Sequence, residues 1–189
     1  MLLVGVFLAF LLFGLKQNPN FNPSQLYGKK SPDFQAKVTD GHVLFFHQLA
    51  QDGRWKILNF WSSGCSICRN EAPELENFYK NVSLKSNKYP EFISINIQDN
   101  ETTIREWQSH YQLTFPVLED TNGFVSLQFG VTGTPETFLI DPAGIVRYRI
   151  AGEIETKTIL HFISWLDSHQ QAKQNDALRA YETLSKSQL

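Results

Sequence analysis

Cysteine is scarce in this chain, which holds only Cys65 and Cys68 among its 189 residues. Two cysteines cannot build the framework of several bridges on which small secreted domains depend. A ring closed between positions i and i+3 removes little freedom from the unfolded chain, so a disulfide here would stabilise the fold only weakly. The pair is therefore expected to carry out chemistry rather than to act as a structural clip.

Clusters of basic residues are also absent, because the largest is the pair Lys29 and Lys30 and the formal net charge is -2. Proteins that bind nucleic acid neutralise the backbone phosphates with grouped lysine and arginine side chains. We therefore expect no nucleic-acid partner.

Metal-ligand patterns are missing as well. The CxxC motif is not repeated, and Arg69 excludes the CxxCH motif of covalent haem attachment. The histidines show no ligand spacing and are spread over positions 42, 47, 110, 161 and 169. We expect no metal, and no cofactor beyond a redox-active disulfide of Cys65 and Cys68.

The longest apolar run is residues 1–15, MLLVGVFLAFLLFGL, which carry no charged side chain. As a helix this run would cover about 22 Å, less than the hydrocarbon thickness of about 30 Å. It has no pair of small residues suited to a signal-peptidase cut, so an uncleaved signal anchor is favoured over a cleaved signal peptide. With the polar residues 16–27 as a tether, the remainder is expected in an extracytoplasmic space where disulfides persist.

Strand and helix patterns alternate from residue 28 to about residue 169, which predicts one α/β domain. The continuous apolar run at 56–61 is typical of a strand buried on both faces. Further strands are predicted at 91–98, at 116–120, and in a hairpin formed by 136–141 and 145–152.

Helices are predicted from Cys65 to about Lys80, at 101–111 and at 156–167, where apolar residues recur at helical spacing. Residues 170–189 are polar with a weak apolar spacing, which indicates a frayed helix or a disordered tail. This order predicts a mixed central sheet with helices on both faces.

The position of the cysteines makes them unequal. Residues three apart on a helix lie one turn apart, within reach of a disulfide. At the helix start, unpaired N–H groups and the helix dipole stabilise a thiolate, so the pKa of the Cys65 thiol should be lowered. Cys65 is the predicted nucleophile, and Cys68 is the thiol that would resolve a mixed disulfide.

A second motif, GTPETFLIDPAGIVRYRIAGEI, occupies residues 133–154. With the FW before the CxxC and the proline inside the following helix, it resembles the thioredoxin superfamily. Within the TlpA/ResA-like branch it resembles the DsbE/CcmG thiol:disulfide interchange proteins of cytochrome c biogenesis. The resemblance runs from about residue 28 to 168, includes the N-terminal anchor, and implies a thioredoxin-like fold.

The resemblance also implies roles for individual residues. Pro135 falls at the family's cis-proline, and the Thr134 backbone would face an extended substrate. Glu71 and Glu136 match two acidic residues of the family; as partly buried carboxyls they would titrate nearer neutrality and transfer protons. Either glutamate could instead be an ordinary solvated acid. The expected substrate-facing surface near the motif also includes Trp61, Gly64, Ser66 and Ile67.

The chain departs from the family pattern at three places. Gly64 stands where the family usually has Trp, and Ser66 and Ile67 replace a proline-containing dipeptide. These departures bear on the redox potential and the substrate-facing surface rather than on the fold, since about 30 mV corresponds to 1.4 kcal/mol for a dithiol couple. Asn59 stands where thioredoxin itself keeps a buried aspartate, so a proton-transfer role would pass to Glu71 or Glu136.

The predicted function is that of a thiol:disulfide oxidoreductase, anchored by a single pass in a bacterial inner membrane and facing the periplasm. The implied partners are apocytochrome c or its haem-ligation proteins, with a membrane electron donor of DsbD/CcdA type. A general TlpA-like reductase is the alternative within the same chemistry. A non-catalytic metal-delivery module is the alternative of another class, but related copper chaperones carry CxxxC rather than CSIC. A peroxidase is disfavoured because neither cysteine lies in a PxxxTxxC pattern.

Overall fold

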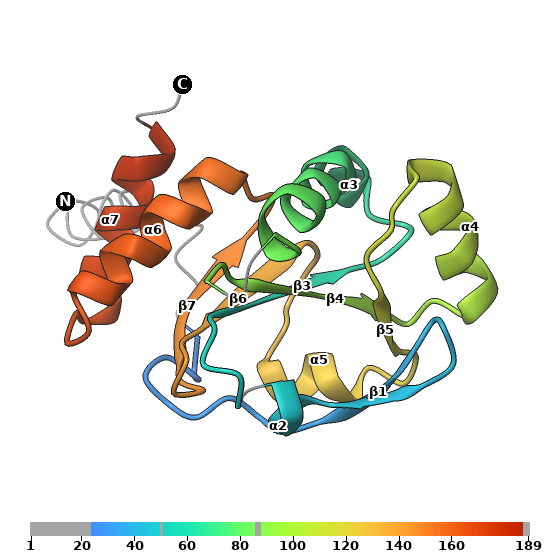
Figure 1. Cartoon of the computed structure of the whole chain (residues 1–189), viewed down its shortest axis with the longest axis horizontal. Coiled ribbons are helices and arrows are strands. Elements are labelled where there is room, and N and C mark those ends of the chain that lie inside the picture. The colour runs from blue at the N-terminus through green and yellow to red at the C-terminus, as the bar shows by residue number, and fades with distance from the viewer. Residues whose placement is uncertain (1–23, 50, 86–87, 187–189) are drawn as a thin grey trace, which may run out of the picture.

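The computed structural model describes residues 24–49, 51–85 and 88–186. They form a seven-stranded sheet with helices on both faces (Figure 1). The predicted anchor at 1–15 lies outside the described residues, as does most of the predicted tether. Within the described ranges, no helix is both long enough and apolar enough to cross a membrane.

The sheet is mixed, as the sequence predicts. From one edge to the other its strands are β2 (Val43–Phe45), β1 (Gln35–Val38), β5 (Val117–Asp120), β4 (Glu91–Ile97), β3 (Lys56–Trp61), β6 (Glu136–Ile140) and β7 (Val146–Ala151). β3, β4 and β5 are parallel, whereas β6 is antiparallel to β3 and forms the predicted hairpin with β7. Every residue of β3 is buried, so this central strand is a rigid base for the segment that follows it.

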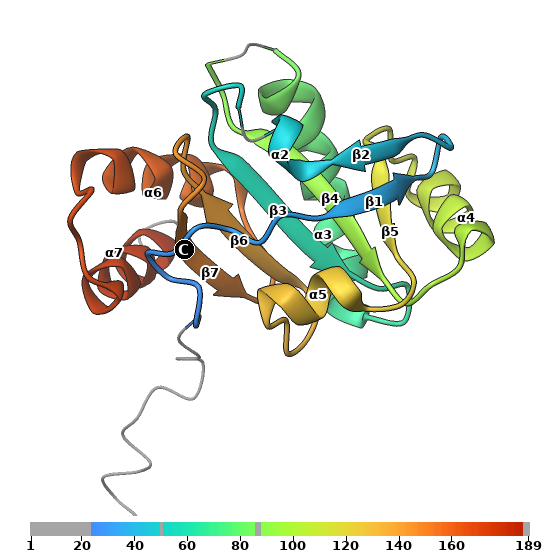
Figure 2. The same ribbon diagram turned by 90° about the horizontal axis from the view of Figure 1, so that it is seen from below.

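Helices cover the two faces of the sheet (Figure 1 and Figure 2). On one face lie α3 (Ser66–Phe78), α4 (Glu101–Tyr111), α6 (Thr156–Ser168) and α7 (Gln174–Lys186). On the other lie α2 (Phe46–Leu49) and α5 (Phe124–Phe129). α3 contains Pro73 and continues as a π-helical turn, η1 (Tyr79–Ser83).

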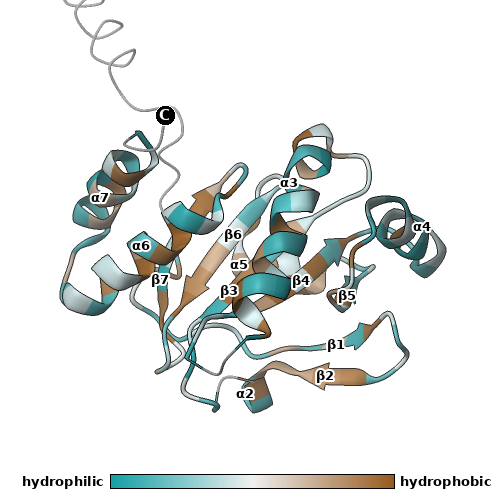
Figure 3. Cartoon of the chain, turned by 45° about the horizontal axis from the view of Figure 1, so that its top comes forward, coloured by the Kyte–Doolittle hydropathy of each residue, from teal (hydrophilic) through white to brown (hydrophobic). Residues whose placement is uncertain are grey.

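The two faces have separate hydrophobic cores because side chains alternate along a strand. In β3, Ile57 and Trp61 belong to the core under α3, while Leu58 and Phe60 belong to the core over α5. In Figure 3, which colours the chain by hydropathy, the central strands are largely hydrophobic, and α3 and α6 carry both hydrophobic and hydrophilic residues.

The structure differs from the prediction in several short elements and in the C-terminal tail. The hairpin of β1 and β2 and the short helices α2 and α5 are absent from the prediction, and β1 extends the sheet by pairing antiparallel with β5. The tail is neither frayed nor disordered over 174–186, where it forms α7 with Ala177 fully buried. The Tyr181 ring packs on Phe162, with ring centroids 5.2 Å apart. The packed domain therefore continues beyond residue 169.

Candidate active site

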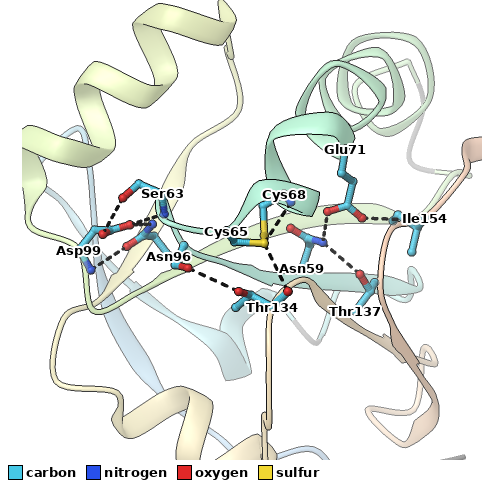
Figure 4. Close-up of a disulfide and its surroundings, with 11 residues drawn as sticks. Asn59, Ser63, Cys65, Cys68, Glu71, Asn96, Asp99, Thr134, Thr137 and Ile154 are labelled. Carbon is cyan, nitrogen blue, oxygen red and sulfur yellow. Dashed lines mark hydrogen bonds between the residues drawn. A yellow bond between two sulfur atoms is a disulfide. The ribbon is translucent and has the colours of Figure 1, made fainter. Parts of the chain in front are cut away.

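The two cysteines lie where the chain leaves the carboxyl end of β3 and enters α3 (Figure 4). They are joined by a disulfide, with their Cα atoms 5.3 Å apart. Cys65 is the N-cap residue of α3, and the backbone N–H of Cys68 donates a hydrogen bond of 3.1 Å to its Sγ atom. In the reduced protein this N–H group and the positive end of the helix dipole would stabilise a thiolate on Cys65.

Exposure separates the two sulfur-bearing residues. Cys65 is half-buried, whereas Cys68 is 3% exposed and packs in the core under α3. Gly64, Ser66 and Ile67 are all exposed around Cys65. A partner protein can therefore reach Cys65 but not Cys68, as the proposed division into attacking and resolving thiols requires.

The loop before β6 brings Thr134 and Pro135 against the disulfide. The peptide bond between them is cis, as the resemblance implies. The carbonyl oxygen of Thr134 lies 3.3 Å from Cys65 Sγ, so two motifs 69 residues apart in sequence meet here. A disulfide sulfur has no proton to donate, so this approach can become a hydrogen bond only in the thiol form.

A hollow of about 320 Å³ opens beside this loop. It is lined by Ser62, Ile97, Gln98, Ser126, Val131, Gly133 and Thr134. Together with the exposed residues around Cys65, the hollow offers an apolar and polar surface on which an extended peptide could lie.

Glu71 lies on α3 three residues after Cys68 and is only 2% exposed. Its carboxylate accepts hydrogen bonds from the backbone N–H of Ile154 at 2.9 Å and from Asn59 Nδ2 at 3.3 Å (Figure 4). Burial raises the pKa of Glu71 to about 7, against the two hydrogen bonds that favour the charged form, and the nearby Glu153 adds to the rise. A carboxyl with this pKa can accept and return a proton at neutral pH.

Glu136 is equally buried but has a different environment. Arg149 forms an ion pair with its carboxylate, with Nε to Oε2 at 2.9 Å. The same carboxylate accepts hydrogen bonds from the backbone N–H groups of Thr132 at 3.1 Å and Gly133 at 3.2 Å. Its contacts hold the loop before Pro135 rather than the cysteines, so the geometry favours a positioning role for Glu136 over the predicted proton transfer.

Trp61 is placed differently from the expected substrate-facing position. Its ring is 4% exposed, stacks on Trp107 with centroids 5.0 Å apart, and donates from Nε1 to Ser94 Oγ at 2.8 Å. The side chain of the last residue in β3 points into the core because β3 is buried on both faces. Trp61 therefore packs in the hydrophobic core below the cysteines and does not face a partner protein.

A set of hydrogen bonds between Ser63 and Asp99 holds the chain before the CxxC motif, and the sequence analysis does not predict it. We call it the Ser63–Asp99 brace. Asp99 accepts hydrogen bonds from the Ser63 N–H at 2.7 Å, from Ser63 Oγ at 2.8 Å and from Asn96 Nδ2 at 2.8 Å. These bonds fix the turn between β3 and Cys65 (Figure 4). The signal in the sequence is the polar run at 98–100, which follows β4, the parallel neighbour of β3, and so lies at the same end of the sheet.

One further observation concerns metal ligands. No group of three or more His, Cys, Asp or Glu side chains in the described part of the chain could hold a metal ion. The helix terminus, the cis-proline loop and the buried Glu71 all lie around the Cys65–Cys68 pair.

Comparisons with known proteins agree with this geometry. The family model described as the AhpC/TSA family matches residues 27–149. The thiol:disulfide interchange protein DsbE of Pseudomonas aeruginosa is 30% identical over 158 residues, which cover 82% of this chain and 84% of that protein. The thiol:disulfide interchange protein HelX of Rhodobacter capsulatus is 30% identical over 161 residues, which cover 84% of this chain and 88% of that protein.

A solved structure gives the same answer for the fold. The structure of MTB DsbF in mixed oxidized and reduced forms has 28% sequence identity and a TM-score of 0.61, and the match covers 76% of this chain and 98% of that one. With a thioredoxin-like fold, a CxxC disulfide at a helix N-terminus and these relatives, the chain is a thiol:disulfide oxidoreductase that belongs to the AhpC/TSA family and, within it, to the DsbE-type thiol:disulfide interchange proteins.

Proposed function

We propose that this oxidoreductase reduces disulfides in apocytochrome c or in the proteins that ligate haem to it. The observation that carries the proposal is the half-buried Cys65 sulfur at the N-terminus of α3, 3.3 Å from the carbonyl oxygen of Thr134. This arrangement presents one sulfur to an extended peptide and keeps the other inside. The motif at 133–154, which resembles the cytochrome c biogenesis proteins, supports the choice of substrate.

The reaction would proceed in two exchanges. The Cys65 thiolate attacks one sulfur of the substrate disulfide, that S–S bond breaks, and the second substrate sulfur leaves as a thiolate. Cys68 then loses its proton and attacks Cys65 Sγ, which releases the first substrate sulfur and forms the Cys65–Cys68 disulfide. Two electrons pass from the protein dithiol to the substrate, whose two sulfurs end as thiols.

The proton of Cys68 needs an acceptor inside the protein. Glu71 lies one helical turn after Cys68, and side chains three apart on a helix are neighbours. Since the pKa of Glu71 is about 7, its carboxylate can take up that proton near neutrality and later return it when the dithiol is restored.

The substrate would lie across the exposed surface around Cys65. The Thr134 backbone and the hollow of about 320 Å³ beside it would receive an extended segment. Gly64, Ser66 and Ile67 would contact the other side of the disulfide. Since these three depart from the family pattern, they are the positions at which substrate preference would differ from that of the relatives.

The proposed location rests on the N-terminal sequence. Residues 1–15 would anchor the chain in a bacterial inner membrane, with the catalytic domain in the periplasm. There the oxidised protein would be reduced again by a membrane thiol-electron donor of DsbD/CcdA type.

Insulin reduction with dithiothreitol as electron source tests the chemistry. The wild-type protein should accelerate the reduction, and Cys65→Ser should abolish the acceleration. If the wild-type protein shows no insulin reduction that depends on Cys65, the proposed disulfide-exchange chemistry is contradicted. Stoichiometric zinc or copper retained by the protein through gel filtration would favour the metal-delivery alternative instead.

Deletion of the gene followed by staining for covalent haem tests the substrate. Loss of c-type cytochromes, restored by wild type but not by Cys65→Ser, is expected. Normal cytochrome levels in a strain without a second copy would instead favour the general TlpA-like reductase.

A further inference from the structure

A second pocket lies beside Glu71, away from the hollow at Thr134. It has a volume of about 410 Å³ and is lined by four parts of the chain: α3, the segment that joins β7 to α6, α6 itself, and α7. Glu71 comes from α3, Glu153 and Glu155 come from the joining segment, and Tyr181 and Ser185 come from α7. Glu71 lines this pocket, although the residue is only 2% exposed. The walls of this pocket therefore decide how much water reaches Glu71.

α7 is firmly attached as one of these walls. Ala177 is fully buried, and the Tyr181 ring lies against Phe162 and Tyr148 with centroids 5.2 and 5.5 Å away. The turn before α7 is held as well, because the Tyr27 hydroxyl donates to the carbonyl of Ala172 at 2.6 Å. α7 lies alongside α6 in both Figure 1 and Figure 2.

We propose that α7 caps the pocket beside Glu71, and that Tyr181 is the positioning residue that keeps the Glu71 carboxyl poorly hydrated. The inference deepens the proposed function and rests on it, because a poorly hydrated Glu71 serves the exchange only if Glu71 handles the proton of Cys68. Tyr181 comes from α7 and would act on the exchange through Glu71.

The groups that face Glu71 are acidic or neutral on every element packed against it. β3 and β6 contribute the neutral side chains Asn59 and Thr137, which are linked by a hydrogen bond of 3.1 Å. The remaining neighbours are the N–H of Ile154, the acidic residues Glu74, Glu153 and Glu155, and the phenol of Tyr181. None of the described residues lining this pocket is basic, so no neighbouring cation there offsets the loss of hydration.

The titration behaviour of both groups is consistent with this arrangement. Burial is the largest cause that raises the pKa of Glu71, to about 7. Burial also raises the pKa of Tyr181 to about 12, and the charges of Glu71 and Glu155 add to the rise. Tyr181 is therefore a neutral ring at physiological pH, and its contribution to Glu71 is the exclusion of water rather than a charge.

The test is a pH titration of the Glu71 carboxyl carbon by NMR in the full chain labelled with ¹³C-glutamate, with the signal assigned through Glu71→Gln. Tyr181→Ala should lower the midpoint by about one unit, because it opens the pocket to water. Tyr181→Phe should leave the midpoint unchanged, since the ring is kept. Leu178→Ala is the matched control, because Leu178 packs on the core from the same helix but does not line the pocket.

A second variant, expected to shift the Glu71 midpoint in the opposite direction, keeps the proposal testable if Tyr181→Ala does not fold. Ser185 lines the same pocket, so Ser185→Leu should fill part of it and raise the midpoint of Glu71. The proposal is overturned if Tyr181→Ala leaves the midpoint unchanged, if Leu178→Ala lowers it as much, or if Ser185→Leu lowers it.

The pH profile of insulin reduction gives a second readout. Its Glu71-dependent limb should move with the NMR midpoint in Tyr181→Ala and stay in place in Tyr181→Phe. A wild type without Cys65-dependent reduction would remove the proposed function while leaving the NMR shift intact, so the two failures are distinguishable.

Discussion

At the scale of single residues, the two buried glutamates near the site have opposite electrostatic environments. Glu71 accepts its hydrogen bonds from neutral groups, the Ile154 N–H and Asn59 Nδ2, while Glu136 is paired with Arg149. The first carboxyl is therefore suited to change its charge, and the second is suited to hold a loop.

Glu71 makes stability depend on pH. Its pKa rises from the ordinary 4.5 to about 7 on folding, so between these values the folded protein binds more protons and its stability falls as pH rises. Glu71→Gln should remove this loss, and the stability of the variant relative to wild type should increase by about 3 kcal/mol between pH 4 and pH 8. Urea unfolding at both pH values measures the difference, with Glu74→Gln on the same helix as the control. If the difference in unfolding free energy between Glu71→Gln and wild type is the same at both pH values, Glu71 is not buried in its neutral form.

Arg149 should matter more than an exposed cation. Its side chain is 5% exposed against Glu136 at 3%, so Arg149→Met would leave a buried charge without a partner and cost about 3–5 kcal/mol. Lys37→Met, which removes a pair exposed at 46% and 40%, should cost less than about 1 kcal/mol. Equal losses of unfolding free energy in the two variants would contradict the loop-holding role of Glu136.

Gly64 offers a test of the substrate-facing surface. A Cβ atom added at this exposed position meets no atom within 4 Å, so Gly64→Trp should change the unfolding free energy by no more than about 0.5 kcal/mol. A Trp beside Cys65 should lower the KM for a peptide disulfide by adding apolar contact. An unaltered KM would mean that substrate does not cross this side of the motif.

At the scale of elements, α5 precedes the cis-proline loop, and one carboxylate accepts the hydrogen bonds of its first turn. Asp120, 2% exposed, accepts hydrogen bonds from the backbone N–H groups of Val125 at 2.9 Å and Ser126 at 2.8 Å. Asp120→Ala would leave both groups unpaired and should cost about 2–3 kcal/mol, with slower disulfide exchange. Asn122→Ala, which removes an exposed cap on the Phe124 N–H, should cost only about 0.5–1 kcal/mol. Thermal unfolding of the two variants makes the comparison.

Elements with long, regular patterns could be predicted closely from the sequence. The strand at 56–61 and the helix at 101–111 have the predicted limits, because a continuous apolar run and a repeated helical spacing leave few alternatives. β1, β2 and α5 have only four, three and six residues, and Val43 and Phe45 of β2 are exposed, so no local pattern marks them. Their structure comes from pairing and capping with distant residues.

The same distinction applies to the site. Cys65, Cys68 and Pro135 lie in motifs that can be recognised locally, whereas the Ser63–Asp99 brace joins residues 36 apart and becomes visible only when β3 and β4 pair. The burial of Trp61 likewise depends on Trp107 of α4, which the local sequence around the cysteines does not contain.

At the scale of the whole molecule, the site lies where distant parts of the chain meet. β3 and α3 supply the cysteines, the loop before β6 supplies Thr134, and α7 reaches the pocket beside Glu71 from the far end of the sequence. The weak apolar spacing of residues 170–189 does not predict a stable helix there. α7 is stabilised by packing on α6 and β7 rather than by its own sequence. One sulfur is thereby open to partners while the acid beside the other is enclosed.

The most direct test of the account is the site of mixed-disulfide formation with oxidised glutathione, mapped by peptide mass spectrometry. Cys68→Ser should accumulate glutathione on Cys65, because the resolving thiol is missing. Cys65→Ser should leave Cys68 unmodified over the same time, because Cys68 is 3% exposed. Glutathione on Cys68 at a comparable rate, or on neither cysteine, would contradict the assignment of Cys65 as the attacking thiol.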